Sequence, residues 1–559
     1  MKNTTKNNEE YNILVGGAAG EGSRMAGLTI AKLLSNYGWR VFIAEDYQSL
    51  IKGGHNFSQI RVTKKRNASP KKTIDFLIAL NDHTLKKHAP DLDKDGIVIF
   101  NSDVSQYEYG FGLSGKEILE QFKCAPIMKN SAFLGALVKV LGMDFSIIED
   151  VFRKEMPKDY NGNVAIARYG YDKAETLLKI EKIKQSPLPL ITGNEALALG
   201  AAKAGLGAYF AYPMTPATNI LHFLAKYTKE FDVKVIQSEN EVAAINQAMG
   251  SAASGIRTMT GTSGGGLALM AEGISCCAQA EIPMVVVNSQ RTGPATGIPT
   301  YGGQSDLEFA KGIGHGDFVR FIVAPGNAEE SFLLGNLAMN MAWKYQTPAI
   351  ILTDKDLSEG TFDFDPKVLT KGTKNKELLW DGKGEYCRYL NSKTGISPLA
   401  YYGQNTVVRV TSYEHDQCGI TAEDSEPDIK MMQDKRLKKF FSLEKEVANI
   451  NSVNVYGNKK SKVAILAWGA VTGVAKEAAQ ALNIKLIQPT ILQPFPKKKV
   501  LQALAGVKNL IAVEMGAKGQ LADLFIENGI KVDSRILKYT GRQFFIEELL
   551  SELKKKIKK

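Results

Sequence analysis

The chain has 559 residues, of which 44% are hydrophobic and 23% are charged, as is usual for a soluble globular protein. A single hydrophobic core rarely grows beyond about 250–300 residues, so this length predicts three or four domains. The net charge is +11, but no platform of aromatic and basic residues accompanies it, so nucleic acid is not an expected partner. No apolar run approaches the roughly 18 residues that a membrane-spanning helix needs, so no membrane association is expected.

The cysteines argue against a metal centre within this chain. They are Cys124, Cys276, Cys277, Cys387 and Cys418, and no two of them form a Cys-x-x-Cys pair. Neither a zinc site nor an iron–sulfur site is therefore predicted. A small, odd number of thiols fits a reducing compartment, and the N-terminus leads into no apolar signal segment, so a cytoplasmic location is predicted.

The first predicted elements alternate between strand and helix. Residues 12–17 form a short apolar strand, 26–37 a helix and 41–44 a second strand. This order predicts a parallel sheet. A further strand is predicted over residues 74–80.

Three glycines follow the first strand at the beginning of the helix, at Gly20, Gly22 and Gly27. Their spacing does not match the dinucleotide fingerprint Gly-x-Gly-x-x-Gly. A tight turn that lets the helix pack on the strand is therefore favoured. A nucleotide site stays open as an alternative, because Glu45 and Asp46 after the second strand could hold a ribose.

Two other glycine-containing stretches suggest ligand loops. Residues 110–116 fit Gly-x-x-x-x-Gly-Lys, but Glu117 stands where a phosphate-binding loop has Ser or Thr, so this stretch is interpreted as a loop before a helix that begins near Lys116. Residues 51–56, Ile-Lys-Gly-Gly-His-Asn, are interpreted as a loop in which Lys52 and His55 could face an anion. A solvated loop is equally consistent with that sequence.

A new domain is predicted after residues 182–189, which are basic and contain two prolines, as a linker often does. A helix begins at residues 192–196. Further strands are predicted at 208–210, 233–237, 283–287 and 349–352, with a helix at 219–228.

Four motifs follow one another within this domain. They are Tyr-Pro-Met-Thr-Pro at 212–216, Glu-Val-Ala-Ala at 241–244, the glycine-rich turn 260–266, and Gln-Arg-Thr-Gly-Pro-Ala-Thr-Gly at 290–297. Two prolines bracket Thr215, which restricts the backbone around its hydroxyl. Taken alone, Glu241 would be a helix N-terminal acid that interacts with the helix dipole. The turn could cradle a phosphate through backbone N–H groups.

The last 200 residues divide into two parts. Residues 361–460 are rich in Gly, Lys and Asp and are interpreted as a long connector. His415 and Asp416 within it fit either acid–base work or a surface turn. A new strand at 462–468, a helix at 475–482 and a strand at 510–514 then predict another α/β domain.

The four motifs resemble the pyrimidine-binding domain of the 2-oxoacid:ferredoxin oxidoreductases, which are thiamine diphosphate enzymes. The N-terminal glycines, the Lys-Gly-Gly-His-Asn stretch and the strand at 74–80 resemble the gamma domain of the same enzymes, and the C-terminal part resembles a transketolase-type domain. The resemblance implies an α/β fold of three parallel-sheet αβα domains. These are a Rossmann-like gamma domain (10–182), a pyrimidine-binding domain (190–360) and, after the connector (361–460), a transketolase C-terminal-like domain (461–555).

The resemblance also implies roles for single residues. Glu241 is the acid that hydrogen-bonds the aminopyrimidine ring, and it is preferred over Glu239 because it lies nine residues before the helix glycine Gly250. Thr215 and Arg291 contact the substrate carboxylate. The remaining residues are Lys52 and Tyr301 for substrate binding, and Tyr212, Pro213, Thr262 and Ser263 for the cofactor pocket.

No Gly-Asp-Gly followed by the asparagine that would hold a magnesium diphosphate is found in the chain. The resemblance therefore implies a beta subunit that supplies the diphosphate site, Mg²⁺ and a [4Fe–4S] cluster, in an αβ dimer or an (αβ)₂ tetramer. Coenzyme A is the implied co-substrate and ferredoxin the implied electron acceptor.

The substrate is predicted to be a 2-oxoacid, with 2-oxoglutarate favoured. Pyruvate, branched-chain or mixed 2-oxoacids remain alternatives, because Tyr301 stands where many relatives have a basic residue and carries no positive charge at pH 7. Other classes that stay open are a nucleotide-dependent dehydrogenase, a non-redox thiamine transferase and a scaffold subunit. An intact Glu241 argues against the scaffold.

Overall fold

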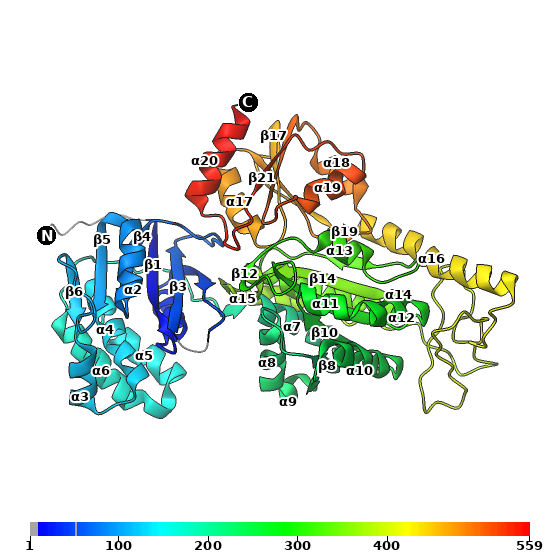
Figure 1. Ribbon diagram of the computed structural model, residues 1–559, viewed down its shortest axis with the longest axis horizontal. Helices are drawn as coiled ribbons and strands as arrows, with labels where there is room; N and C mark the ends of the chain where they lie inside the picture. Colours follow the sequence, from blue (N-terminus) through cyan, green and yellow to red (C-terminus); the bar gives the residue numbers. More distant parts are fainter. Residues whose placement is uncertain (1–8, 51–52, 559) are drawn as a thin grey trace. The chain divides into compact units, whose positions relative to one another are not determined.

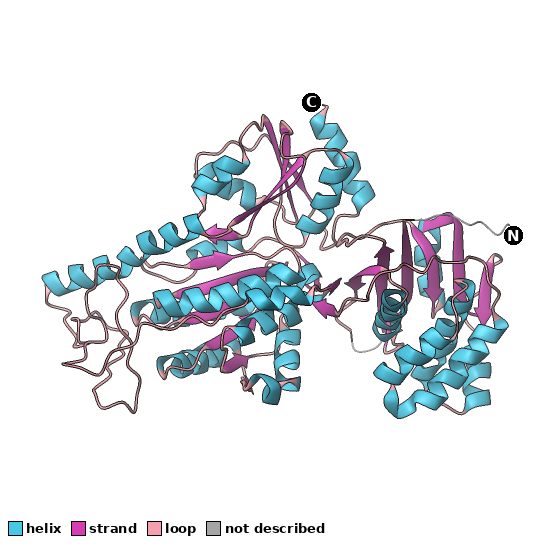
Figure 2. Ribbon diagram, turned by 180° about the vertical axis from the view of Figure 1, so that it is seen from behind, coloured by secondary structure: helices cyan, strands magenta, loops and turns pink. Residues whose placement is uncertain are grey.

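The computed structural model describes residues 9–50 and 53–558, and these form two compact units. The first unit consists of the residues up to Ile191 together with Gly360–Asp365 and Phe544–Glu548. The second consists of Thr192–Glu359, Pro366–Gln543 and the residues from Leu549. Both are built from sheets flanked by helices (Figures 1 and 2).

The first unit is organised around one sheet in the order β6-β5-β4-β1-β3-β2-β15-β7. Its strands are β1 (Glu10–Ala19), β2 (Arg40–Asp46), β3 (Gly53–Thr63), β4 (Ile74–Ala79), β5 (Leu92–Asn101), β6 (Gly110–Leu113), β7 (Leu190–Thr192) and β15 (Thr361–Asp363). Its helices are α1 (Ser23–Asn36), α2 (Asp82–His88), α3 (Gly115–Phe122), α4 (Asn130–Val140), α5 (Ser146–Glu155) and α6 (Tyr160–Lys173), with short 3-10 turns η1 (Ala89–Asp91), η2 (Pro126–Lys129) and η3 (Pro157–Asp159).

This first sheet is mixed, so the prediction of a wholly parallel sheet is wrong for it. Strand β3 lies between β1 and β2 and runs antiparallel to both, whereas β1, β4, β5 and β6 run parallel. The predicted loop at 51–56 is correspondingly wrong over its described part, because Gly53 and Gly54 open β3 and His55 is buried in it. Residues 51–52 lie outside the described residues. The two glycines suggested a loop. The residues typical of a strand come just after them, at Phe57, Gln59, Arg61, Ile60 and Val62.

Two smaller expectations for this unit can be compared directly. Gly110–Leu113 is strand β6 rather than a loop, paired along β5, and α3 then begins at Gly115 with Ser114 as its N-cap. The N-terminal glycine turn has the left-handed backbone that favours glycine, with φ of 91° at Gly20 and 80° at Gly22. Glu45, the alternative ribose ligand, accepts a hydrogen bond from Ser58 Oγ at 2.6 Å.

The second unit contains two sheets. The larger has the order β19-β13-β14-β11-β10-β8-β9, with β12 paired to β11. Its strands are β8 (Ala208–Ala211), β9 (Lys234–Gln237), β10 (Thr258–Thr262), β11 (Met284–Thr292), β12 (Ile298–Gly302), β13 (Phe321–Val323), β14 (Pro348–Asp354) and β19 (Ile491–Gln493). Its helices are α7 (Gly193–Lys203), α8 (Thr218–Lys226), α9 (Thr228–Phe231), α10 (Glu241–Ala253), α11 (Gly264–Leu269), α12 (Ala271–Gln279), α13 (Leu307–Gly312), α14 (Ala328–Tyr345) and α15 (Lys355–Glu359).

Strands β8, β9, β10, β11, β13 and β14 all run parallel, which confirms the α/β fold predicted for this part. The central strands are buried on both faces, as their uninterrupted Val and Ile runs require. Because the strands are parallel, the loops after β8, β10 and β11 meet at one edge of the sheet. The four sequence motifs lie at this edge.

The smaller sheet has the order β16-β18-β17-β20-β21. Its strands are β16 (Val453–Gly457), β17 (Val463–Leu466), β18 (Lys485–Pro489), β20 (Asn509–Glu514) and β21 (Ser534–Leu537), and the neighbouring helices are α17 (Val471–Ala481), α18 (Lys497–Ala503), α19 (Gln520–Glu527) and α20 (Ile546–Ile557). Residues 453–559 are called the C-terminal region below.

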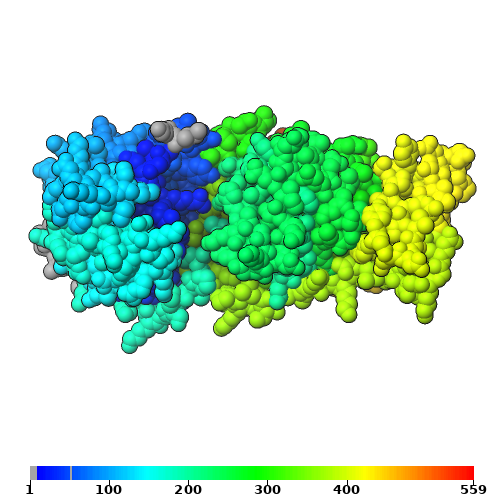
Figure 3. Space-filling view, turned by 90° about the horizontal axis from the view of Figure 1, so that it is seen from below, coloured from blue at the N-terminus to red at the C-terminus, as the bar shows by residue number. Residues whose placement is uncertain are grey.

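The predicted connector is more structured than expected. It contains the 3-10 turn η4 (Pro366–Lys371) and a 24-residue helix, α16 (Glu426–Asn449), while the segment between them lies on the outside of the second unit (yellow in Figure 3). His415 is fully buried and stacks on Tyr389, with 3.8 Å between ring centroids, so the surface-turn interpretation is wrong. Its isolated sequence gave no sign of the aromatic ring that covers it.

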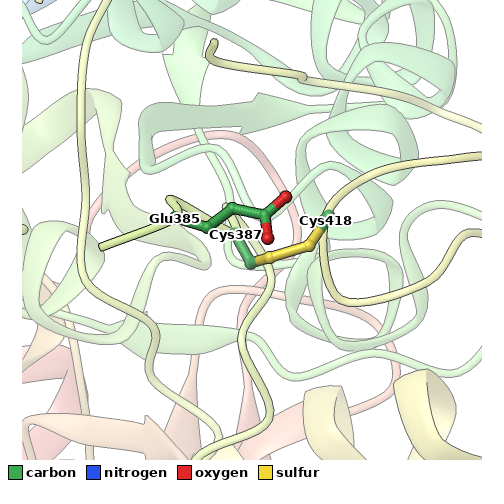
Figure 4. A group of neighbouring side chains, drawn as sticks. All are labelled: Glu385, Cys387 and Cys418. Carbon is green, nitrogen blue, oxygen red and sulfur yellow. A yellow bond between two sulfur atoms is a disulfide. The ribbon is translucent and has the colours of Figure 1, made fainter. Parts of the chain in front are cut away.

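The segment is also closed by a disulfide between Cys387 and Cys418 (Figure 4). The expectation of unpaired thiols therefore fails for these two cysteines, which lie 31 residues apart. Spacing alone could not indicate a pair so distant in sequence. The Glu385 carboxylate lies beside the two sulfurs.

Candidate active site

Glu241 is the first residue of α10 and is 3% exposed. Asn240 caps the helix by accepting a hydrogen bond from Ala243 N at 2.8 Å, which holds the carboxylate at the sheet edge. The hydroxyl of Thr262, at the end of β10, lies 3.5 Å from Glu241 Oε1. The neighbouring acid Glu239 is exposed and contacts the Asn240 side chain.

Gly266 leaves room for this acid. A Cβ at position 266 would overlap Thr262 Oγ1 and Glu241 Oε1 and would lie 2.7 Å from Glu241 Cγ. A Cβ on the adjacent Gly265 would meet no atom within 4 Å. The glycine-rich turn therefore has one position at which the missing side chain shapes the site and one at which it does not.

Arg291 lies within β11, not in the loop after it as the strand prediction for 283–287 implied. Its side chain is 9% exposed and donates from Nη1 to the Thr215 carbonyl oxygen at 3.0 Å. Burial lowers the pKa of the guanidinium, while the carboxylates of Asp306 and Glu241 act in the opposite direction. The structure thus joins Thr215, Glu241 and Arg291, which come from three separate motifs, into one site.

Three further residues at this site were not predicted. Asn288 Nδ2 donates to Asp306 Oδ2 at 3.0 Å, and Gln290 Oε1 accepts from Asp306 N at 3.1 Å. Burial raises the pKa of Asp306, and the Asn288 hydrogen bond and the Arg291 charge lower it in part. Polar residues at the end of the apolar strand β11 were the available sequence signal for Asn288 and Gln290. Asp306 had none, because its contacts depend on the fold.

Several buried polar atoms here have no hydrogen-bond partner within the described residues. They are Ser263 Oγ, Asn288 Oδ1 and Arg291 Nε. Such atoms are rare in folded proteins and often mark the place of a ligand. The site offers a buried carboxylate, hydroxyl and amide acceptors, a guanidinium and a glycine without a side chain. Together these groups suit a flat heteroaromatic ring with an amino group, next to a small carboxylate. The residues present therefore fit the aminopyrimidine half of thiamine diphosphate.

The other predicted site residues are placed as follows. Tyr212 is 38% exposed and Pro213 half-buried, in the loop after β8. Tyr301 lies in β12, with its ring 4.5 Å from the guanidinium carbon of Arg542. Lys52 lies outside the described residues.

Comparisons with known proteins show which family the chain resembles. An alpha subunit of a 2-oxoacid:ferredoxin oxidoreductase from Saccharolobus solfataricus is 30% identical over 98% of both chains. The chain belongs to the 2-oxoacid:ferredoxin oxidoreductase family. A second such alpha subunit, from Aeropyrum pernix, is 29% identical over 98% of this chain and 97% of its own.

Two family models match separate parts of this 2-oxoacid:ferredoxin oxidoreductase subunit. The model described as pyruvate flavodoxin/ferredoxin oxidoreductase, thiamine diphosphate-binding, matches residues 199–435, and that described as pyruvate ferredoxin/flavodoxin oxidoreductase matches 12–173. A solved structure is also similar, with a TM-score of 0.88 and 27% identity over 98% of this chain and all of the other. It is the 2-oxoglutarate:ferredoxin oxidoreductase of Magnetococcus marinus. The thiamine diphosphate domain and the enzyme class predicted from the motifs are confirmed.

Among the described residues, no helix combines the length and the apolar character needed to cross a bilayer.

Proposed function

We propose that this chain is the alpha subunit of a 2-oxoglutarate:ferredoxin oxidoreductase. The overall reaction converts 2-oxoglutarate, coenzyme A and two oxidised ferredoxins into succinyl-CoA, CO₂, a proton and two reduced ferredoxins. The observation that carries the proposal is the buried Glu241 at the sheet edge that also carries Arg291, where Ser263 Oγ, Asn288 Oδ1 and Arg291 Nε have no hydrogen-bond partner within the described residues.

Glu241 is assigned to the aminopyrimidine ring. Thiamine diphosphate, when bound, supplies the carbanion chemistry, while the protein orients and polarises it. A carboxylate that is 3% exposed interacts strongly with a ring nitrogen, because little water screens the pair. Thr262 and Gly266 lie against this carboxylate.

Arg291 is assigned to the carboxylate next to the keto group. One of its terminal nitrogens is already engaged by the Thr215 carbonyl, while its Nε is buried without a partner within the described residues. A substrate carboxylate would satisfy that donor, and guanidinium–carboxylate pairs are strong and directional. The same contact with Thr215 fixes the loop that carries the Thr215 hydroxyl beside the substrate.

A partner subunit is assigned the diphosphate half. The apolar side chains of Val242 and Leu269, next to Glu241 and at the end of the glycine-rich helix, are 47% and 54% exposed. Apolar surface beside a buried polar site is typical of a protein interface. The beta subunit would cover it and bring Mg²⁺, the diphosphate ligands and the [4Fe–4S] cluster.

The preference for 2-oxoglutarate rests on two relatives. The similar Magnetococcus marinus structure contains 2-oxoglutarate, coenzyme A and succinyl-CoA, and the 2-oxoglutarate synthase subunit KorA of Methanothermobacter marburgensis is 30% identical over 60% of this chain. A ketoisovalerate oxidoreductase subunit, VorB of Methanothermobacter thermautotrophicus, is 28% identical over 65%. Branched-chain 2-oxoacids are therefore the second candidate substrate class.

The test is reconstitution with a beta-type partner subunit. The complex, supplied with thiamine diphosphate, Mg²⁺ and coenzyme A, should reduce a viologen dye with 2-oxoglutarate, and either subunit alone should not. Activity of this chain alone would contradict the partner assignment. A higher kcat/KM for ketoisovalerate would replace the proposed substrate.

Substrate choice is tested separately at Lys52 and Arg291. Arg291→Ala should damage every 2-oxoacid, whereas Lys52→Ala should lower kcat/KM for 2-oxoglutarate about 10- to 100-fold more than for pyruvate, as expected for one charge-assisted contact. Tyr301→Arg should raise the use of 2-oxoglutarate. Equal losses for both acids in Lys52→Ala would remove Lys52 from the substrate-reading set.

A further inference from the structure

The net positive charge of the chain comes from the C-terminal region. Residues 453–559 contain 19 of the 70 Lys and Arg and 8 of the 59 Asp and Glu, a difference of +11. This equals the net charge of the whole chain, so the preceding residues, with 51 of each sign, are neutral. An excess confined to one region produces a directional field, whereas a diffuse excess does not.

Part of this charge lies at one edge of the smaller sheet, because of the directions in which its strands run. Strands β17, β18, β20 and β21 run parallel, and β16 runs antiparallel to β18. The C-terminal end of β16 therefore lies at the same edge as the N-terminal ends of the other four. Figure 1 shows β17 and β21 in this sheet.

Lysines occupy the connections at this edge. Lys459 and Lys460 follow β16, Lys462 precedes β17, Lys508 precedes β20 and Lys531 precedes β21. Lys508 N donates to the Lys462 carbonyl oxygen at 2.7 Å, so these two residues are adjacent. At about 4.8 Å per strand, the row spans roughly 19 Å. We call these five residues the lysine edge.

Most of the lysine edge has no counter-charge. All five lysines are exposed, and Lys531 pairs with Asp533 at 2.6 Å. Over the part of the chain that the structure describes, the other four form no ion pair. Lys459 and Lys460 line a shallow hollow together with residues at the end of α17. By contrast, Arg535 in this region forms an ion pair with Asp523.

We infer that the lysine edge is the docking surface for an acidic electron-carrier protein. The inference rests on the proposed function, whose reaction requires a soluble protein to remove electrons and leave at each turnover. Unpaired, hydrated lysines suit that task, because they accelerate encounter through long-range attraction and form few strong short-range bonds. Nucleic acid is a poorer match, since reading it relies on arginines and stacking aromatic residues, and the lysine edge consists of lysines alone.

The experiment uses the assembled holoenzyme and a purified acidic ferredoxin. The variant Lys459→Gln/Lys460→Gln/Lys462→Gln/Lys508→Gln is compared with a control that removes the same charge elsewhere in the region, Lys497→Gln/Lys498→Gln/Lys554→Gln/Lys556→Gln. At low ionic strength the first variant should lose about 10-fold in kcat/KM for ferredoxin and show a flatter salt dependence. Viologen reduction should stay unchanged in both.

The readouts separate this inference from the proposed function. Ferredoxin binding, measured directly by titration, should weaken only in the lysine-edge variant. Equal binding and equal kcat/KM in the two variants would overturn the inference while viologen activity still supports the function. Loss of duplex DNA binding, with ferredoxin binding intact, would overturn it in favour of a nucleic-acid surface.

Discussion

At the scale of single residues, the site depends on the Glu241 carboxylate, which the fold buries away from solvent. Glu241→Gln retains the shape of the side chain but loses the charge that polarises the ring, so turnover should fall about 10²- to 10⁴-fold while assembly with the partner is unchanged. Glu239→Gln is the matched control, because that acid is exposed. Steady-state kinetics and gel filtration of the complexes decide it, and a larger loss in the Glu239 variant would reassign the acid.

Gly266 offers a second test that leaves every polar group in place. Gly266→Ala inserts a methyl group against Glu241 and Thr262, which must then move apart, so activity should fall at least 10-fold because small displacements of catalytic groups are costly. Gly265→Ala adds the same methyl group to the same helix in open space. Similar activity and thermal stability in the two variants would show that the glycine does not shape the acid's position.

The sequence allowed Glu241, Thr215 and Arg291 to be predicted because each sits in a short local motif. Asp306 could not be predicted in the same way. Its place is set by Asn288 and Gln290, on a strand that precedes it and pairs with β12, and such contacts follow from the register of strands rather than from neighbouring residues.

At the scale of secondary structure elements, apolar runs predicted strands well, whereas glycines led to a strand being predicted as a loop. Strands β8, β14 and β20 lie within one or two residues of the prediction, because a buried parallel strand is a continuous run of Val, Ile and Leu. Strand β3 was missed because Gly53 and Gly54 open it. Helix α16 was missed because its many charged residues obscure the buried apolar positions Met432, Leu443 and Val447. Leu443 and Val447 belong to the core of the second unit.

A pair of buried histidines, His55 in β3 and His88 in α2, should make the stability of the first unit sensitive to acid. His55 Nε2 lies 2.9 Å from His88 Nε2, an arrangement that accommodates only one proton between the two atoms. Burial, together with Lys87 and His83, lowers the pKa of His55 to about 4, and burial, His55 and Lys87 lower that of His88 to about 3.

Because both values lie below the ordinary 6.5, the unfolded chain binds these protons first as the pH falls. The free energy of unfolding should therefore be constant above about pH 6.5 and decrease by on the order of 3 kcal/mol for each histidine towards pH 4. Urea unfolding followed between pH 4 and 8 measures the slope. His88→Gln should flatten it, whereas His222→Gln, at an exposed histidine of α8, should not. An unchanged slope in His88→Gln would exclude the pair.

The disulfide should stabilise the segment before α16. Closing a loop of about 30 residues is worth roughly 3–4 kcal/mol in the chain-entropy model. Cys387→Ser should therefore lower Tm, and adding a reductant to the wild-type protein should lower it similarly. Cys124→Ser, at an unpaired cysteine, is the control. A peptide map without reduction that lacks the Cys387–Cys418 link would contradict the pairing.

At the scale of the whole molecule, the Gln304 side chain is one of the links between the C-terminal region and the catalytic sheet. Gln304 Nε2 donates to the Trp468 carbonyl at 2.8 Å and to Asp354 Oδ2 at 3.3 Å, and its Oε1 accepts from Met515 N at 2.9 Å. Gln304 lies two residues after β12, which pairs with the end of β11 that carries Arg291.

Gln304→Ala should leave several buried polar groups unpaired and lower the free energy of unfolding by about 2–4 kcal/mol. It should also raise KM for the 2-oxoacid, since the hairpin that carries Arg291 loses its support. Gln502→Ala, on the exposed face of α18, serves as the reference substitution. Calorimetry and kinetics of the same preparations connect the two effects, and a stability loss with an unaltered KM would restrict Gln304 to a structural role.

The Gln304 contacts bear on how such subunits can be recombined. Its three partners come from β14, from the second residue after β17 and from the first residue after β20, so the C-terminal region is not an interchangeable module. A chimaera that imports this region from a relative would have to import Asp354 and the loop after β12 with it. Natural gene fusions and splits in this family are therefore expected to fall before residue 192, where Gln304 and its three partners stay on one chain, rather than at the start of β16.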